Sequence, residues 1–155
     1  MIESTHAIII ITITSLLLTQ FIKFCIHASI NKKFDEKIFF STGGMPSSHS
    51  ALVTSLAVSI GLFQYHDNNL LDYPFVVSLV LALVVIHDSM GIRYESSKHA
   101  RELNQIKFRL NLIENIEAEE KKLKEALGHK PVEVLIGVIL GAIFGIIGFL
   151  IFRIF

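Results

Sequence analysis

The sequence predicts an all-α polytopic membrane protein, a helical bundle of about four transmembrane helices plus a cytoplasmic amphipathic helical segment. Three observations lead to this prediction. Of the 155 residues, 52% are hydrophobic and the mean hydropathy is +0.57, which is more apolar than a soluble domain of this size. The apolar residues gather into four segments, and the basic residues gather in two of the three loops between them. A chain of this length is enough for a single membrane domain, residues 1–155.

The four apolar segments cover about residues 6–30, 48–65, 73–92 and 132–155. Each is roughly long enough to cross ~30 Å of hydrocarbon as a helix, and the second is the shortest. We expect helices rather than strands because the backbone must satisfy its own hydrogen bonds in lipid. The first segment has no basic residue before it and no small-residue cleavage pattern after it, so we expect it to be retained as a membrane helix.

The loops between these segments differ in charge. The first holds three Lys residues, the second (66–72) holds no Lys or Arg, and the third holds nine basic residues. Since Lys and Arg near membrane spans stay in the cytoplasm, loops one and three are predicted to be cytoplasmic. Both termini are then outside the cell. We therefore expect an integral membrane protein of a bacterial plasma membrane, with the lipid bilayer as its surroundings.

The third loop is predicted to be helical over about residues 94–128. It contains no Gly or Pro between Ser96 and Leu127, and Gly128 is typical of a helix end. Apolar residues recur there at spacings of three and four, which indicates an amphipathic helix. Two interpretations stay open: a cytoplasmic hairpin or membrane-surface helix, and a lid over an active site.

A polar stretch from Gly43 to Ser50 precedes the second apolar segment. Pro46, Ser47 and Ser48 predict a turn followed by a helix cap. Free backbone amides and the positive end of the helix dipole favour an anion at such a position. His49 could then give a proton to a leaving oxygen. The alternative is an ordinary helix cap with an incidental His.

A second polar stretch, from Gly128 to Glu133, precedes the last apolar segment. Pro131 suits the first turn of a helix, and His129 and Glu133 are four residues apart. A carboxylate that holds one imidazole nitrogen leaves the other free as a nucleophile or base. A charge at mid-membrane costs roughly 2.5–3.5 kcal/mol, less near a helix end, which argues for a partner of Glu133. The alternative is a carboxylate that reaches the membrane surface by itself.

Three further charged residues lie in or beside the apolar segments. Lys23 either extends to the membrane surface or faces a site. Asp88 and Arg93 either pair with each other, or Arg93 binds a phosphate through its guanidinium group. A metal site from His49, His129, Asp88 and Glu133 is conceivable, but the usual zinc spacing is missing, so we expect neither metal nor cofactor. The formal net charge of zero gives no reason to expect nucleic acid.

Glycines recur every fourth residue in the last apolar segment, at Gly137, Gly141 and Gly145. Small residues on one face let membrane helices approach closely, so we expect this row to pack against another helix. The same row permits a homo-oligomer.

Two stretches of the chain resemble the signature motifs of type 2 phosphatidic acid phosphatases and vanadium haloperoxidases. The stretch from Met45 to Ala51 is similar to their Pro-Ser-Gly-His motif, and that from His129 to Val134 is similar to their His-three-residues-Asp motif. The chain most resembles a small, divergent bacterial and plant branch of that superfamily. Its pattern is Gly-Gly-Met-Pro-Ser-Ser-His, then Asp-x-x-Gly-x-Arg, here Asp88 to Arg93, then Leu-Gly-His-x-Pro-x-Glu-Val.

The resemblance covers nearly the whole chain, and it implies roles for its residues. In the superfamily the later His attacks phosphorus, an acidic residue orients it, and the earlier His protonates the leaving group. His129 would be the nucleophile, oriented by Glu133, with His49 as general acid. The implied phosphate-binding residues are Ser47, Ser48, Lys23, Arg93 and Asp88.

The chain departs from the superfamily pattern at several positions. Ile30-Asn31 replace an Arg-Pro pair, and Leu123 replaces the Arg that lies six residues before the second His. The resemblance implies that Lys122, Lys124 or Arg93 supplies the missing cation.

The expected function is hydrolysis of a phosphomonoester or pyrophosphate on a membrane lipid through phosphohistidine, without a metal, at the cytoplasmic membrane surface. The expected partner is therefore a phosphorylated membrane lipid. One alternative is a catalytically inactive relative that binds such a lipid for transport or as a scaffold. Another is a structural membrane subunit without a ligand.

Overall fold

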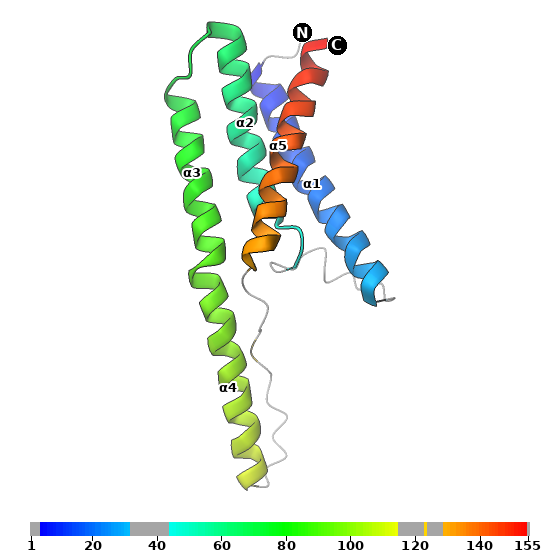
Figure 1. Ribbon diagram of the computed structural model, residues 1–155, viewed down its shortest axis with the longest axis vertical. Helices are drawn as coiled ribbons and strands as arrows, with labels where there is room; N and C mark the ends of the chain where they lie inside the picture. The colour runs from blue at the N-terminus through cyan, green and yellow to red at the C-terminus, as the bar shows by residue number, and fades with distance from the viewer. Residues whose placement is uncertain (1–3, 32–43, 115–122, 124–128, 155) are drawn as a thin grey trace.

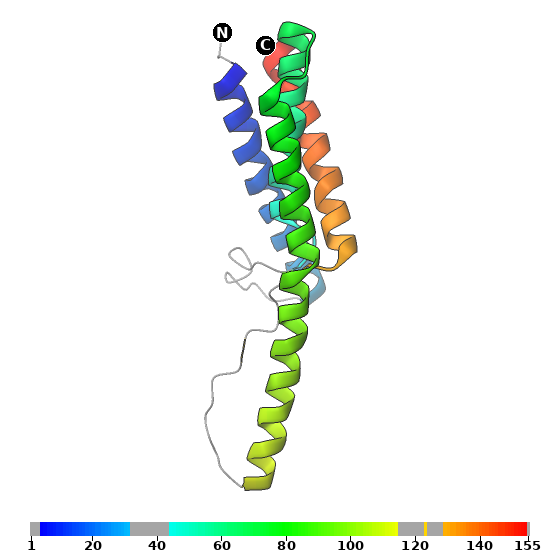
Figure 2. The same cartoon turned by 90° about the vertical axis from the view of Figure 1, so that its left-hand side faces the viewer.

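The computed structural model describes residues 4–31, 44–114, 123 and 129–154, and all regular structure in these ranges is α-helical. Helix α1 spans Ser4–Asn31, α2 Ser48–Asn68, α3 Tyr73–Met90, α4 Ile92–Glu114 and α5 Pro131–Ile154. Helices α1, α2, α3 and α5 form one bundle, and α4 continues α3 away from it (Figures 1 and 2). The structure thus confirms the predicted all-α bundle. The division into membrane spans within one domain stays a prediction.

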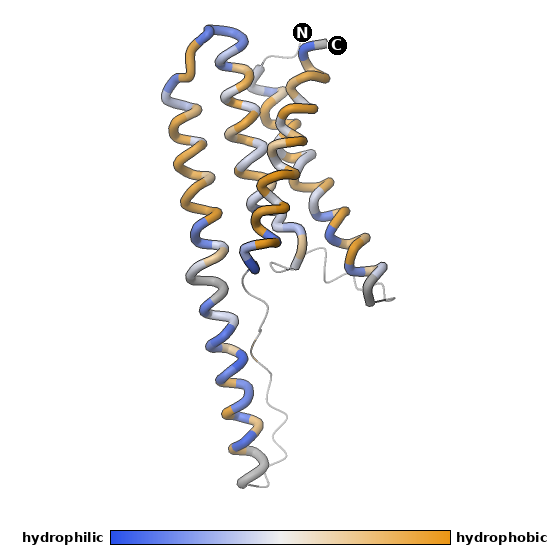
Figure 3. The backbone as a smooth tube through the Cα atoms, viewed as in Figure 1, coloured by the Kyte–Doolittle hydropathy of each residue, from blue (hydrophilic) through white to orange (hydrophobic). Residues whose placement is uncertain are grey.

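Helix α2 lies in the middle of the bundle, between α1, α3 and α5 (Figure 1). By length and composition, three helical stretches in the described part of the chain can cross a membrane: Ser4–Ser29, Tyr73–Leu110 and Pro131–Arg153. Helix α2 is less apolar because several of its buried positions are serines, including Ser50, Ser55 and Ser59. Its neighbours carry the strongly apolar surfaces along the bundle (Figure 3). A small, polar central helix lets the three outer helices approach it closely.

The buried face of α1 is a row of residues spaced four apart: Ala7, Ile11, Ser15, Thr19 and Lys23. A helix places such residues on one side, one turn above another. The other sides of α1 expose large apolar residues, as expected for a surface in contact with lipid. The buried row changes from apolar to polar toward the end of α1 that contains Lys23.

The glycine row of α5 packs against α2, as predicted. A Cβ atom added at Gly137 would come 2.4 Å from the Ser47 carbonyl oxygen, and one at Gly141 would come 2.4 Å from that of Ala51. Contacts below about 3 Å are not available to real Cβ atoms, so these positions require glycine at this helix spacing. The close approach brings the starts of α2 and α5 together.

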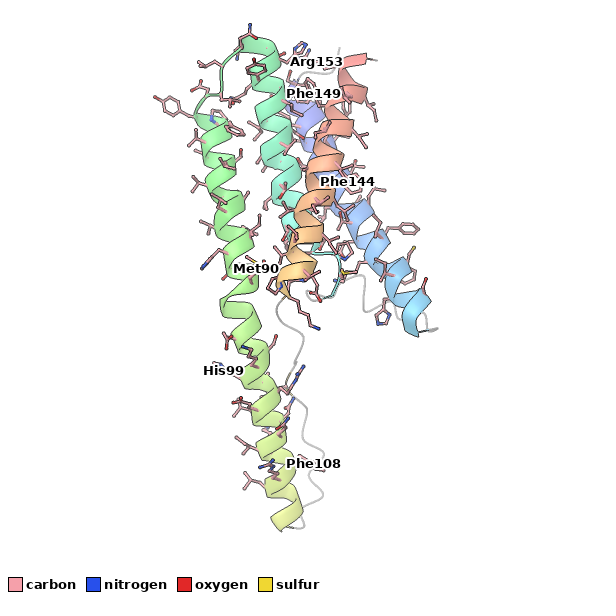
Figure 4. The ribbon with its side chains drawn as sticks, viewed as in Figure 1. Met90, His99, Phe108, Phe144, Phe149 and Arg153 are labelled. Atoms are coloured by element: carbon pink, nitrogen blue, oxygen red, sulfur yellow. The ribbon has the colours of Figure 1, made fainter. Side chains whose placement is uncertain are left out.

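The two termini lie at one end of the bundle, and the starts of α2 and α5 lie at the other (Figure 1). At the terminal end, the Asp67 carboxylate of α2 accepts hydrogen bonds from Ser4 of α1 and Arg153 of α5. The Arg153 guanidinium also lies 5.3 Å from the ring centroid of Phe63. Figure 4 shows Arg153 and Phe149 on the last turns of α5, beside the start of α1. This cluster joins three helices far from the predicted site.

Candidate functional site

His129 and Glu133 form the centre of the candidate site. Pro131 begins α5, so His129 lies just before the helix and Glu133 lies in its first turn. The Nδ1 atom of His129 is 3.1 Å from Oε2 of Glu133, and the Lys130 backbone N–H donates to the same oxygen at 3.2 Å. Because a carboxylate only accepts hydrogen bonds, Nδ1 carries the proton and Nε2 keeps a free lone pair. The predicted pairing of these two residues is present.

The His129 ring is buried, with 3% of the residue exposed. Its Nε2 atom has no hydrogen-bond partner of normal geometry among the described residues. Burial lowers the pKa of His129 below its usual value, and Glu133 and the Gly44 backbone oppose this by stabilising the protonated ring. The nearby Lys23 charge lowers the pKa further. Burial and the Lys23 charge thus favour the neutral form of the ring.

Backbone hydrogen bonds join three distant segments at His129. The His129 N–H donates to the Ser89 carbonyl at the end of α3, at 3.2 Å. The Ser47 N–H donates to the Glu133 carbonyl at 3.0 Å. These bonds, together with the contact at Gly137, bring the two polar stretches of the sequence to one place.

Lys23 is the cation of this site that the structure describes. It is 3% exposed although it lies on a membrane helix, and its charge acts on the His129 ring. Its side chain runs beside Gly44, where an added Cβ would lie 3.3 Å from the Lys23 Cε atom. Gly44 also has φ +96°, a conformation that favours glycine. Lys23 is therefore buried beside Gly44 and close to the His129 ring.

Ser47 caps α2 as the sequence predicts. Its hydroxyl oxygen accepts a hydrogen bond from the Ser50 N–H at 3.4 Å and lies 2.9 Å from the Ser50 hydroxyl. Ser47 and Ser48 are both buried, at 0% and 2% exposed. Their helix start therefore offers hydroxyls and a positive dipole end at a place closed to bulk water.

The other predicted residues lie around this centre. His49 is the second residue of α2 and is partly buried. Asp88 is partly buried and directly precedes Ser89, whose carbonyl holds His129. The backbone of Arg93 lies in the first turn of α4, and its side chain is outside the described structure. Lys122 and Lys124 also lie outside the described residues.

Within the described ranges, no group of three or more His, Cys, Asp or Glu side chains is arranged to hold a metal ion. Leu123, at the position of the missing Arg, exchanges two hydrogen bonds of 3.0 Å between its backbone and the Asn104 side chain.

The sequence did not predict two features of the site: the contact of Gly44 with the Lys23 side chain, and the hydrogen bond from the His129 N–H to the Ser89 carbonyl. The four-residue spacing of the buried row on α1 could have placed Lys23 inward, because that row is visible in the sequence.

Comparisons with known proteins agree with the resemblance seen in the motifs. The family model described as "Divergent PAP2 family" matches residues 4–144. An "Uncharacterized membrane protein YuiD" of Bacillus subtilis (strain 168) is 34% identical over 139 residues, which cover 84% of this chain and 85% of the relative. No solved structure matches the chain. The family match contains every candidate residue discussed above.

Proposed function

Because the chain belongs to the divergent PAP2 family, we propose that it is a membrane lipid phosphatase that works through a phosphohistidine intermediate. The observation that carries this proposal is the state of His129. Its Nδ1 is held by Glu133, while its Nε2 is buried beside the Gly44 backbone and has no hydrogen-bond partner of normal geometry among the residues that the structure describes. A carboxylate-held imidazole keeps the lone pair of its second nitrogen for attack on an electrophile.

In the proposed reaction, His129 Nε2 attacks phosphorus and the bond to the leaving oxygen breaks. His49 gives that oxygen its proton. Glu133 stabilises the positive charge that the His129 ring acquires. Water then attacks the phosphohistidine and gives a proton to His49, which restores its acid form. The nitrogen–phosphorus bond breaks, and inorganic phosphate leaves with the neutral His129 ring restored.

The groups around His129 suit a phosphate. Lys23 supplies a buried positive charge, and Ser48 lies at the first residue of α2, where backbone N–H groups and the helix dipole favour an anion. The Ser47 N–H is used by the Glu133 carbonyl, so Ser47 contributes its position and its hydroxyl. Asp88 and Arg93, which flank the junction of α3 and α4, complete the proposed set of phosphate-binding residues.

A lipid substrate is supported by an apolar cavity of about 170 Å³ between α1 and α5. It is lined by Ile10, Leu18, Phe144 and Ile151, among others. A helix rises 1.5 Å per residue, so Phe144 lies about 20 Å along the chain axis from His129. A lipid with its phosphate at His129 would need a long chain to reach this cavity.

The site lies at the end of the bundle opposite both termini (Figure 1). The distribution of Lys and Arg predicts that this end faces the cytoplasm. We therefore place the proposed activity at the cytoplasmic surface of the membrane.

The direct test uses purified protein in lipid vesicles with phosphatidate, phosphatidylglycerophosphate or an isoprenyl pyrophosphate. We expect the wild type to release inorganic phosphate from at least one of them. His129→Gln should abolish release while its thermal unfolding stays cooperative. Undiminished release by His129→Gln would refute the proposed nucleophile.

A lipid-binding relative without activity is the second candidate, and one observation favours it. The position of the missing Arg is occupied by Leu123, which is uncharged and partly exposed. If no lipid is hydrolysed but orthovanadate still raises the melting temperature of the wild type and not of Lys23→Met, binding without catalysis is the better account. No response to lipid or vanadate favours a structural subunit.

A further inference from the structure

Helix α4 leaves the bundle with a row of large apolar side chains on its surface. Leu103, Ile106 and Leu110 are 49%, 52% and 50% exposed. The rest of α4 is mostly polar, as Figure 3 shows. Three large apolar side chains in one row on a polar helix outside the bundle are typical of an interaction surface.

The spacing of this row is that of a coiled coil. The three residues follow one another at intervals of three and four, and the sequence continues the pattern with Ile113. Apolar residues at such intervals occupy the a and d positions of a heptad repeat. Leu103 and Leu110 are then a positions, and Ile106 is a d position.

The row lies beside two contacts that α4 makes within its own chain. Ala100 is buried, and the Asn104 side chain is hydrogen-bonded to the backbone of Leu123. With 3.6 residues per turn, the centre of the row lies about a third of a turn from these two residues. A partner helix can therefore reach the row beside the chain's own contacts.

The charges that flank the row match a second copy of the same helix. Glu102 and Lys107 are exposed and occupy the g and e positions on opposite sides of the row. In a parallel coiled coil, a g residue lies opposite the e residue five positions later on the partner. Glu102 of each copy then faces Lys107 of the other. In the sequence, Arg109 and Glu114 repeat this spacing with opposite charges.

We propose that α4 pairs in parallel with α4 of a second copy of this chain, through Leu103, Ile106 and Leu110. Two copies with the same orientation in one membrane hold their α4 helices parallel, as the charge pattern requires. The row is short for a coiled coil in solution, but tethering to one membrane raises the effective concentration of the partner helix. Leu at a with Ile at d favours three or four strands over two, so the pair of helices can belong to a larger parallel bundle of copies of this chain.

The first test is disulfide crosslinking in membranes, in a Cys25→Ser background. Ile106→Cys should give crosslinked product at twice the 17.4 kDa chain mass under mild oxidation, since each chain then carries one thiol. Phe108→Cys is the matched control. Phe108, labelled in Figure 4, is 66% exposed, and helix geometry places it about half a turn away from the row. Equal yields at the two positions, or no product at either, would overturn the proposal.

The second test exchanges the flanking charges while Ile106→Cys reports the pairing. Glu102→Lys and Lys107→Glu, each alone, should lower the crosslinking yield severalfold, and the two together should restore it. A double variant as poor as the single ones would contradict the pairing, provided that all variants unfold at the same temperature. If the row lies on the bilayer instead, Ile106→Cys will be shielded from a water-soluble maleimide without crosslinking, which also overturns the proposal.

Discussion

Glu133 determines what the His129 ring can do, since its carboxylate accepts both the Nδ1 proton and the Lys130 N–H. Glu133→Gln replaces the carboxylate by an amide that can present either an oxygen or an N–H to the ring. We expect phosphate release to fall by a factor on the order of 10⁴, as when the carboxylate that holds a catalytic His is neutralised elsewhere. The steady-state rate of phosphate release from a lipid that the wild type hydrolyses measures this fall.

Lys130→Gln is the matched control for that experiment. Lys130 is exposed, and it contacts Glu133 through its backbone N–H, which the substitution keeps. Its activity should stay near that of the wild type. Wild-type activity in Glu133→Gln would show that the carboxylate has no role in the reaction.

The protonation of His129 gives a second prediction at this scale. Burial lowers its pKa in the folded protein, whereas an unfolded His titrates near 6.5. The unfolded chain therefore binds a proton first as the pH falls. The contribution of this ring to stability is complete above about pH 6.5 and is lost as the pH falls toward the lowered pKa.

Nitrogen NMR of ¹⁵N-histidine-labelled protein in micelles can check the pKa, with the His129 signal assigned by its loss in His129→Gln. We expect the ring to be neutral and protonated on Nδ1 at pH 6.5. A ring that is already an imidazolium at that pH would contradict the assigned state.

Helix α5 can contact α2 closely because Gly137 lies directly on the Ser47 carbonyl. Gly137→Ala would place a Cβ 2.4 Å from that backbone oxygen, so the two helix starts must move apart. We expect lower thermal stability and a loss of phosphate release, because the bond from Ser47 to Glu133 lies at the same contact. Melting temperature and activity, measured together, check this.

Gly61→Ala is the control, since the atoms nearest to its Cβ would be those of the Phe75 ring, a side chain that can rotate. Alanine is otherwise the better helix former, by about 1 kcal/mol. The Gly61 variant should therefore lose less stability than the Gly137 variant and keep its activity. Equal losses of stability and activity in the two variants would show that the site does not depend on the close contact between α2 and α5.

At the scale of elements, the described helices agree with what hydropathy and capping signals predict from the sequence. Local patterns carry this information: Ser47 begins α2 and Pro131 begins α5. The pairing of His129 with Glu133 was predictable because it lies within one helical turn. The contacts of the Ser89 carbonyl and of Gly44 were not predictable, since they join segments far apart in the chain. The central place of α2, the least apolar of the bundle helices, also follows from packing and not from its hydropathy.

The whole molecule has two different ends. One end carries both termini and the cluster around Asp67, and the other carries the candidate site. The charges of the loops predict that the site end is cytoplasmic. Single cysteines at Lys130 and at Asn69, in a Cys25→Ser background, test this in intact cells.

A membrane-impermeant maleimide should label the Asn69→Cys variant from outside, because Asn69 is exposed in the turn between α2 and α3. The Lys130→Cys variant should react only after the cells are opened. The reverse pattern would place the site outside the cell, and labelling of both from one side would contradict the bundle.

The central claim is that His129 takes the phosphoryl group from the lipid. Its most direct test is to mix the protein with an active lipid carrying ³²P in its terminal phosphate, stop the reaction in alkaline denaturant, and map the labelled peptide. We predict base-stable, acid-labile label on the peptide that contains His129, and none on the His129→Gln protein. Steady turnover without labelled enzyme, or label that persists in His129→Gln, would contradict the account.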